Sequence, residues 1–329
     1  YDTPIALGVL NGREVPLQMI PQEGDRICFL DMNSVESYNT YISTFLFVLI
    51  AAMNRARPQV MLEVQNTFGN ALYCDIKNKI VLSDYDLADV AAEMKAMIQE
   101  KTPITLSFKK KQEAWSYVKP RFYCDQAPLL SALPDDVEIP VYELDGVSAY
   151  FVNPLLPHLG YLKEFELIRM GSGILLRYGK RGHYDRLEPF ARRDKLAAVY
   201  ADSEKMGQRL HCPTVAALNQ FIKRGNSREI ILACEAQHEK KIAQIADAIA
   251  SEERGVRLVL IAGPSSSGKT TFSQRLAVQL RVNGMRPIPI SMDNYFKERK
   301  DTPRLPDGSY DFESLGALDT DLFNEQLHE

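Results

Sequence analysis

Apolar and polar residues alternate over the first thirty positions in the manner of short strands. Ile5 to Leu10 leads into Asn11-Gly12, a pair that tolerates the positive φ angles of a two-residue hairpin turn, and a further strand is expected over Arg26 to Leu30. Ser37 to Met53 then has the apolar spacing of a mostly buried helix. The elements expected next are strands over 59–64 and 71–76 and an amphipathic helix over 87–99.

The second half of the chain is more helical. Residues 104–176 have a mixed pattern of strand and loop with many prolines, after which helices are predicted over 194–208, 214–224 and 229–253. Gly255 ends the last helix, and Arg257 to Ala262 is a continuous apolar run typical of a buried strand. We predict the main domain boundary near 224–235. The four predicted segments are 1–32, 33–226, a connector helix over 227–255, and 256–329.

Composition limits the class of protein. At roughly 100–200 residues per domain, the 329 residues predict two or three domains. The chain is 45% hydrophobic and 25% charged with a net charge of −4, which excludes a disordered chain and gives no basic footprint for non-specific nucleic-acid binding. Its Cys count of 5 is odd and includes no CxxC pair, which favours a reducing compartment, the cytoplasm. The most apolar run, 42–53, is short of the roughly 20 residues of a membrane span, so none is expected.

The sharpest motif follows the apolar run 257–262. Residues 263–270, GPSSSGKT, satisfy GxxxxGK[ST] at every position and precede a helical segment, as this motif requires. Gly263 and Gly268 let the backbone turn its N–H groups toward phosphate oxygens, and the helix adds its positive dipole end. We expect Lys269 to reach the β- and γ-phosphates and the Thr270 hydroxyl to bind Mg²⁺. The predicted ATP-binding residues are Gly263, Ser265, Ser266, Ser267, Gly268, Lys269, Thr270 and Thr271.

A second candidate is Asp293, which follows the predicted strand Pro287 to Met292. In a parallel sheet the carboxyl end of a neighbouring strand opens beside the phosphate-binding loop. Asp293 is therefore expected either to accept a proton from an attacking hydroxyl or to hold Mg²⁺ as a Walker-B-type aspartate.

These segments resemble the uridine kinase and phosphoribulokinase family. The resemblance rests on residues 263–271, on SMDNYF at 291–296 and on YDFESLGALD at 310–319. It implies that Asp293 and Lys269 are catalytic, with Asp293 the general base for a sugar hydroxyl. It also implies that Tyr295 and Phe296 line the acceptor pocket and that Asp311, or alternatively Asp319, holds the ribose hydroxyls.

The resemblance implies an ATP- and Mg²⁺-dependent kinase that phosphorylates uridine, cytidine or a similar nucleoside. One alternative acceptor is a phosphorylated sugar, for which Lys297, Arg299, Lys300 and Arg304 supply cations. The other alternative is an RNA-binding ATPase or regulatory switch. A homo-oligomer is possible in each case.

The front of the chain resembles a different family. Residues 6–30 are similar to the second half of a TGS domain, a small β-grasp module, and residues 70–76 and 87–104 are similar to the second additional domain of threonyl-tRNA synthetases. Segments 160–167 and 236–242 are similar to uridine kinase-like proteins that carry such a front. The fold class expected is therefore an α/β multidomain chain: a partial β-grasp, an α+β synthetase-editing-like domain, and the first part of a parallel-sheet P-loop domain.

Two features qualify what the resemblance implies. The synthetase domain carries HxxxH on the helix that corresponds to 37–53, but this helix contains no His, so zinc or editing chemistry is not expected. The resemblance also implies further β-grasp residues before Tyr1 and a kinase lid after Glu329, so this chain alone is not expected to turn over. An RNA contact remains an alternative to a solvated face for the basic cluster of Arg177, Lys180, Arg181, Arg186, Arg192, Arg193 and Lys195.

Overall fold

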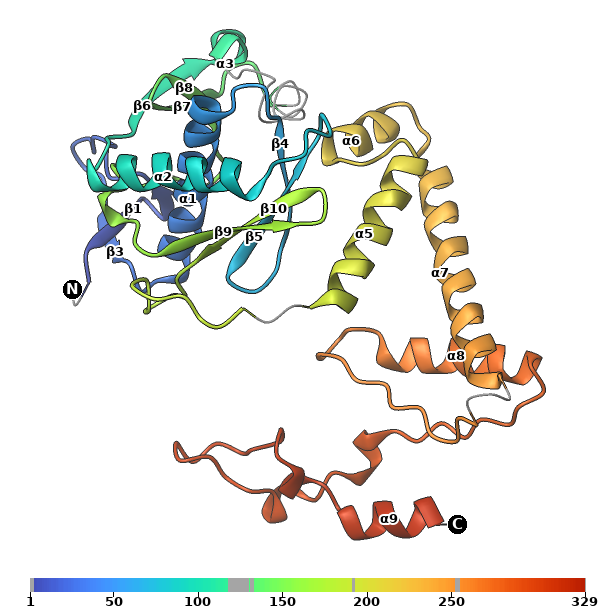
Figure 1. Ribbon diagram of the computed structural model, residues 1–329. Coiled ribbons are helices and arrows are strands. Elements are labelled where there is room, and N and C mark those ends of the chain that lie inside the picture. The colour runs from blue at the N-terminus through green and yellow to red at the C-terminus, as the bar shows by residue number, and fades with distance from the viewer. Residues whose placement is uncertain (1–2, 118–129, 131–132, 191–192, 252–254, 329) are drawn as a thin grey trace. The chain divides into compact units, whose positions relative to one another are not determined.

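The computed structural model describes residues 3–117, 130, 133–190, 193–251 and 255–328. The chain divides into two compact units, Tyr1–Gly225 and Asn226–Glu329 (Figure 1). Each unit has hydrophobic side chains clustered in a core of its own.

The first unit opens with an antiparallel sheet in the order β2-β1-β3, formed by Ile5–Leu10 (β1), Arg13–Val15 (β2) and Ile27–Asp31 (β3). The predicted hairpin turn is confirmed, because Asn11 and Gly12 have φ angles of 51° and 81°. The Asn11 side chain also ties the turn to the segment before β3: its Nδ2 donates to Asp25 Oδ1 at 2.7 Å, and its Oδ1 accepts from the Arg26 N–H at 3.0 Å. The Asn at this position therefore both makes the turn and fixes the third strand.

Helix α1, Val35–Ala56, lies at the centre of this unit. Ser34 caps it by accepting a hydrogen bond from the Ser37 N–H, and every residue from Phe45 to Met53 is buried. The helix contacts α2 and strands of all three sheets of this unit, which are described below. Because neighbours surround it, the helix needs apolar residues on every side. It is long and apolar enough to cross a membrane by length and composition, but 67% of its most apolar stretch is buried inside the protein.

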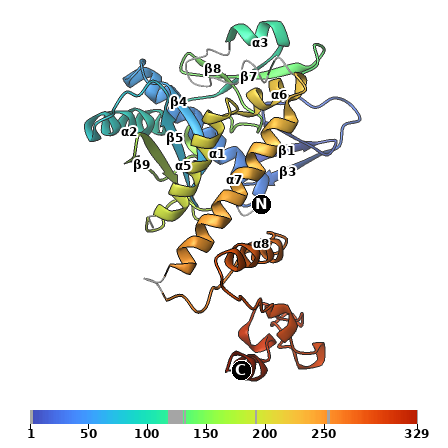
Figure 2. The same cartoon turned by 90° about the vertical axis from the view of Figure 1, so that its right-hand side faces the viewer.

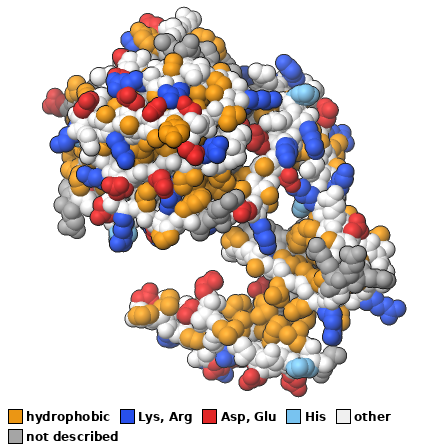
Figure 3. Space-filling view, in the orientation of Figure 1, with side chains coloured by type: hydrophobic (Ala, Val, Ile, Leu, Met, Phe, Trp, Pro, Cys, Tyr) orange, Lys and Arg blue, Asp and Glu red, His pale blue; other side chains and the backbone are white. Residues whose placement is uncertain are grey.

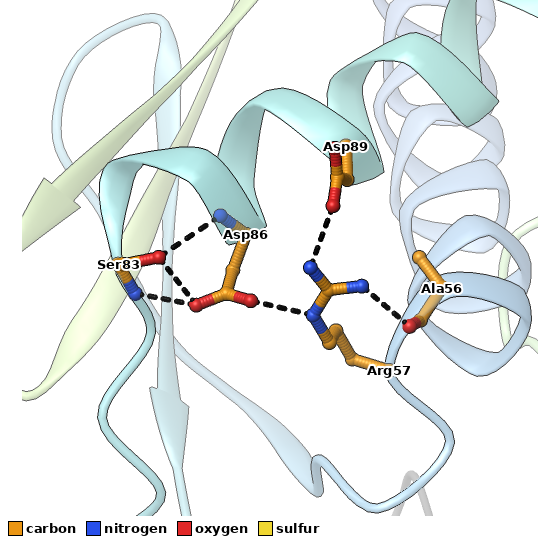
Figure 4. Close-up of polar contacts among 5 residues, drawn as sticks. All are labelled: Ala56, Arg57, Ser83, Asp86 and Asp89. Atoms are coloured by element: carbon orange, nitrogen blue, oxygen red, sulfur yellow. Dashed lines mark hydrogen bonds and ion pairs between the residues drawn. The ribbon is translucent and has the colours of Figure 1, made fainter.

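Helix α2, Asp84–Gln99, is joined to the end of α1 by charged groups (Figure 4). Ser83 and Asp86 form a reciprocal capping box at the start of α2. Arg57, the C-terminal cap of α1, donates to Asp86 Oδ1 and Asp89 Oδ2, both at 2.6 Å, and to the carbonyl of Ala56 at 2.7 Å. One guanidinium therefore closes the end of one helix and fixes the start of the next.

The largest sheet is antiparallel in the order β4-β5-β10-β9. Its strands are Leu62–Thr67 (β4), Ala71–Ile76 (β5), Phe165–Met170 (β9) and Gly173–Tyr178 (β10). Ile174, Leu176 and Tyr178 face the core around α1, whereas Leu175 alternates to the opposite, outer face. Helix α5, Asp194–Arg209, lies beside β5 of that sheet (Figure 2). The ring of its residue Tyr200 contacts Phe68 next to the β4–β5 turn.

A third antiparallel sheet, β6-β7-β8, completes this unit. Its strands are Thr105–Lys110, Glu138–Leu144 and Val147–Tyr150, and the short helix α3, Lys111–Tyr117, packs on β6 and β7. The 3₁₀ helix Leu159–Tyr161 precedes β9, and helix α6, Val215–Lys223, ends the unit. The helices and strands predicted from 5 to 99 and from 194 to 224 are confirmed, with bounds shifted by a few residues at most.

The second unit is built on two packed helices, α7 (Ser227–Ala250) and α8 (Lys269–Val282). Ile242 and Ala246 of α7 pack against Leu276 and Leu280 of α8. The remaining elements are the 3₁₀ helices Met292–Tyr295, Arg299–Asp301 and Leu315–Ala317 and helix α9, Thr320–His328. The helix predicted over 229–253 is thus confirmed as α7, with a start two residues earlier.

The parallel sheet expected in this unit is not present among its described residues. Neither 257–262 nor 287–292 forms a strand, and Leu260 and Ile288 are 84% and 83% exposed. Hydrophobic side chains gather on the visible face of this unit (Figure 3). A strand exists only through hydrogen bonds to a neighbouring strand, and these two apolar segments have no such neighbour in the described structure.

Candidate functional site

The loop at 263–268 has the backbone shape that its motif predicts. Ser266 and Gly268 have φ angles of 58° and 82°, and α8 begins at Lys269, directly after the left-handed glycine. A Cβ at Gly263 would lie 2.7 Å from Ser267 Oγ, so any side chain here would force Ser267 to change its rotamer. The loop is compact and leads straight into the N-terminus of a helix.

Lys269 is folded back over this loop. Its Nζ donates to the carbonyl oxygens of Gly263 and Pro264, each at 2.9 Å. The ammonium is therefore held at the loop by the loop's own carbonyl groups. The predicted hydroxyl-bearing residues of the loop are all exposed: Ser265, Ser266, Ser267, Thr270 and Thr271. This donor set fits a triphosphate with Mg²⁺, because phosphate oxygens need N–H and ammonium donors and Mg²⁺ takes hydroxyl and phosphate oxygens.

Asp293 lies in the 3₁₀ helix Met292–Tyr295 and is exposed. The two aromatic residues beside it differ from each other in environment. Tyr295 is 6% exposed, packs edge-on against Phe323 at 5.0 Å and donates to Gln326 Oε1 at 2.6 Å. Phe296 is partly exposed, with its ring 6.4 Å from that of Phe312.

The two candidate ribose-binding aspartates are engaged in local turns. Asp311 Oδ1 accepts from the N–H groups of Glu313 and Ser314, both at 3.1 Å. Asp319 Oδ1 accepts from the Leu322 N–H at 3.0 Å, at the start of α9. Within the described part of this unit, no hydrogen bond or ion pair joins the loop 263–271 to Asp293 or Asp311.

In the first unit, helix α1, on which the synthetase resemblance would place an HxxxH motif, carries aromatic residues near its start. The rings of Tyr41 and Tyr184 lie 4.6 Å apart, and Tyr41 also meets Phe45 at 4.9 Å. The Tyr38 hydroxyl donates to the carbonyl of Gly179 at 3.2 Å, and that of Tyr184 donates to the carbonyl of Met32. Burial raises the pKa of both Tyr38 and Tyr184 to about 12, so these phenols are neutral at physiological pH.

No group of three or more His, Cys, Asp or Glu side chains placed to hold a metal ion occurs among the residues that the structure describes. The rings of Tyr38, Tyr41 and Phe45 on α1 pack against Tyr178 and Tyr184.

The basic cluster between 177 and 195 is divided between internal and exposed cations. Arg177 pairs with Glu166, donates to the carbonyl of Glu188 and lies over the Phe190 ring at 5.1 Å, while Lys180 is 3.5 Å from Glu188 Oε1. The other described members, which form no ion pair with any described residue, are Arg181, Arg186, Arg193 and Lys195. Arg192 lies outside the described residues. The number of Lys and Arg residues identified this segment in the sequence. It did not show that Arg177 is engaged inside the unit by Glu166, Glu188 and Phe190.

Comparisons with known proteins point to one family of relatives. No family model matches the chain. The chain is 27% identical over 165 residues to the threonine--tRNA ligase of Chlamydia trachomatis serovar L2b, a match that covers 50% of this chain and 26% of that protein. It is 24% identical over 242 residues to the threonine--tRNA ligase of Bacillus velezensis, and 23% identical over 242 residues to threonine--tRNA ligase 1 of Bacillus subtilis. Each of these two matches covers 66% of this chain and 38% of the relative, so the chain spans well under half of their length.

These relatives agree with the resemblance of the front half to a TGS domain and to threonyl-tRNA synthetases. They correct the expected function, because they are ligases of threonine and tRNA and not kinases. The predicted nucleoside kinase was therefore wrong, and so was the nucleoside substrate. A uridine kinase or phosphoribulokinase relationship has no support among these relatives.

Proposed function

We propose that this chain binds tRNA through residues 1–225 and acts in a cytoplasmic function related to tRNA aminoacylation. The observation that carries this proposal is the similarity to threonine--tRNA ligases over half to two thirds of the chain. The free cysteines Cys28, Cys74, Cys212 and Cys234 are consistent with a reducing compartment.

The exposed cations of the segment 180–195 are the groups best suited to meet RNA. Arg181, Arg186 and Lys195 are free of ion pairs to described residues, whereas Arg177 and Lys180 face Glu166 and Glu188. Phosphate contacts from such side chains release counterions and supply most of the affinity for a nucleic-acid backbone. Because the whole chain is acidic, at −4, any RNA-binding surface must be local, and this segment is such a concentration of positive charge.

Charge reversal tests the proposal. The double variant Arg181→Glu, Arg186→Glu of the full chain should bind unfractionated tRNA at least roughly tenfold more weakly than the wild type, because each substitution replaces an attraction to phosphate by a repulsion. Fluorescence anisotropy of labelled tRNA measures this. The matched control is Lys95→Glu, Lys110→Glu, which makes the same change of charge at exposed positions of α2 and β6.

The control variant separates a local contact from the effect of net charge. An equal loss of affinity in both double variants would contradict the placement of tRNA on this segment. Failure of the wild-type chain to bind tRNA would contradict the proposal as a whole.

We infer, as a second proposal, that residues 263–271 bind ATP with Mg²⁺. The motif, the left-handed Gly268 and the position of the loop before α8 support this. The loop N–H groups and Lys269 would hold the phosphates, and Thr270 would ligate Mg²⁺ together with phosphate oxygens. Asp293 is proposed as a further Mg²⁺-facing carboxylate.

Nucleotide binding is measurable without any assumption about catalysis. Lys269→Ala should weaken binding of a fluorescent ATP analogue by about tenfold or more, because it removes the charge opposite the phosphates. Thr270→Ala should remove most of the Mg²⁺ dependence of binding and change the metal-free affinity little. Lys240→Ala, an exposed cation of α7, is the control that should leave both unchanged. Equal affinity of the wild type and Lys269→Ala would contradict the assignment of this loop.

A further inference from the structure

Helix α5 is weakly anchored to the outer face of the largest sheet. None of its residues is buried, although it lies beside β5 (Figure 2). Its ring contact with this part of the unit is that of Tyr200 with Phe68, whose centroids are 5.3 Å apart. Elements with few buried apolar contacts open at a low cost in free energy. A modest change in the interactions beneath α5 is therefore enough to hold it down or to release it.

The sheet presents two carboxylates to this helix. Asp75 of β5 points to the outer face, because its neighbours Cys74 and Ile76 both belong to the core around α1. Glu63 of β4 is directly opposite Asp75 in the β4–β5 register, so its side chain lies on the same face. Like charges directly opposite each other on neighbouring strands repel and destabilise the pair.

Partners on the sheet offset part of this repulsion. The Lys77 ammonium lies 2.6 Å from Glu63 Oε2, and Gln65 also donates to Glu63. The Ser172 hydroxyl donates to Asp75 Oδ1 at 2.9 Å. When both carboxylates are ionised, the single ammonium of Lys77 leaves one negative charge in excess on this part of the sheet.

Glu204 of α5 brings a third carboxylate to the same place. It follows Tyr200 by four residues, so both side chains lie on one side of the helix. Glu204, Asp75 and Lys77 line one cavity of about 480 Å³, bounded by α5, the end of β5 and the β9–β10 turn. Glu204 accepts a hydrogen bond from Gln208 Nε2 at 3.0 Å, within α5 itself, and forms no ion pair with any residue that the structure describes.

These surroundings disfavour the ionised form of Glu204. Burial raises the pKa of Glu204 above its ordinary value of 4.5, and the charges of Asp75 and Glu63 raise it further, against an opposing effect of Lys77. Further titratable or charged groups at this cavity or beside it are Tyr73, Lys79 and Arg169. Because an undocked α5 would return Glu204 to water, the docked helix takes up a proton more readily than the undocked one.

We propose that α5 is a pH-sensitive flap on the outer face of the largest sheet, held down when Glu204 is neutral and loosened when Glu204 is ionised. Docking is strongest below pH 4.5, where Glu204 is protonated whether or not α5 is docked. It weakens as the pH rises through the raised pKa of the docked form, because the docked helix then holds a charge beside two others of the same sign. The flap concerns the fold of the first unit and does not depend on the proposed tRNA binding.

Hydrogen exchange of the full chain, followed by mass spectrometry, measures the opening of α5. The quantity compared is the protection of peptides from 194–209 after correction for the intrinsic exchange rate at each pH. Wild-type protection should rise about twofold or more from pH 7.5 to pH 4.5. Glu204→Gln, which keeps the size and the helix propensity of the side chain, should have the higher protection at both pH values. Peptides from α2 serve as the internal reference.

Two further variants make the result decisive. Lys205→Gln changes the charge of an exposed neighbour on the same helix and should keep the pH dependence of the wild type. Tyr200→Ala removes the ring contact with Phe68 and should lower the protection of 194–209 at both pH values. Wild-type protection that does not change with pH, or a pH dependence that persists in Glu204→Gln, would overturn the flap. Unchanged protection in Tyr200→Ala would overturn it as well, because the sheet would then not be what protects α5.

Discussion

At the scale of single residues, Arg57 and Asp86 show how one ion pair organises two helices. Asp86 accepts from the Ser83 N–H at 2.7 Å and from the Ser83 hydroxyl at 2.6 Å, and it faces the guanidinium of Arg57. The hydrogen bonds from Ser83 and the contact with Arg57 lower the pKa of Asp86 from 3.8 to about 2. The folded protein therefore stabilises the ionised form of the Asp86 carboxylate.

This shift predicts a pH dependence. A carboxylate whose pKa is lower in the folded state stabilises it fully above pH ~4, and this contribution is lost as the pH falls toward ~2. Asp86→Asn should lower the Tm of the first unit at pH 6 by about 2–4 °C, the shift expected when a domain of this size loses one capping interaction. The difference in Tm from the wild type should shrink between pH 4 and pH 2.

Calorimetry across this pH range checks the prediction. Asp136→Asn, at an exposed position outside the capping box, should have the Tm of the wild type at every pH. A difference for Asp86→Asn that stays constant from pH 6 to pH 2 would contradict the role assigned to the charge of Asp86.

At the scale of elements, local patterns predicted helices and turns well because their interactions are local. The Asn11-Gly12 turn follows from two residues that tolerate positive φ, and the helices over 35–56, 84–99, 194–209 and 227–250 follow from apolar spacing, with Ser34 and Ser83 as caps of the first two. The apolar segments 257–262 and 287–292 were predicted as strands and are not, because a strand depends on a partner that its own residues do not specify. The pattern of apolar residues identified both segments as hydrophobic, but it did not show whether a neighbouring strand was present to pair with them.

The candidate sites divide in the same way. The loop at 263–268 could be predicted because its glycines, lysine and threonine are contiguous in the sequence. The division of the basic cluster could not be predicted, because the ion pair of Arg177 with Glu166 depends on the pairing of β9 with β10. Tyr295, expected in an acceptor pocket, packs against Phe323, and only the fold of the C-terminal segment shows this.

At the scale of the whole molecule, the chain joins a first unit similar in sequence to threonine--tRNA ligases with a second that carries the GxxxxGK[ST] sequence motif. The kinase expected from the second unit is overturned by relatives that act on tRNA. Each unit has a hydrophobic core of its own, so the RNA-binding and nucleotide-binding proposals concern separate structures and can fail separately.

If the first unit binds tRNA through phosphate contacts, as proposed, the affinity must depend on salt concentration. The dissociation constant of the full chain for tRNA should rise steeply between 50 and 200 mM salt. The logarithm of the association constant, plotted against the logarithm of the salt concentration, should have a slope of about −2 to −4, as expected for phosphate contacts from a few cations. The slope should become shallower by about two in Arg181→Glu, Arg186→Glu. Undetectable binding at 50 mM salt, or binding that does not change with salt, would contradict the account.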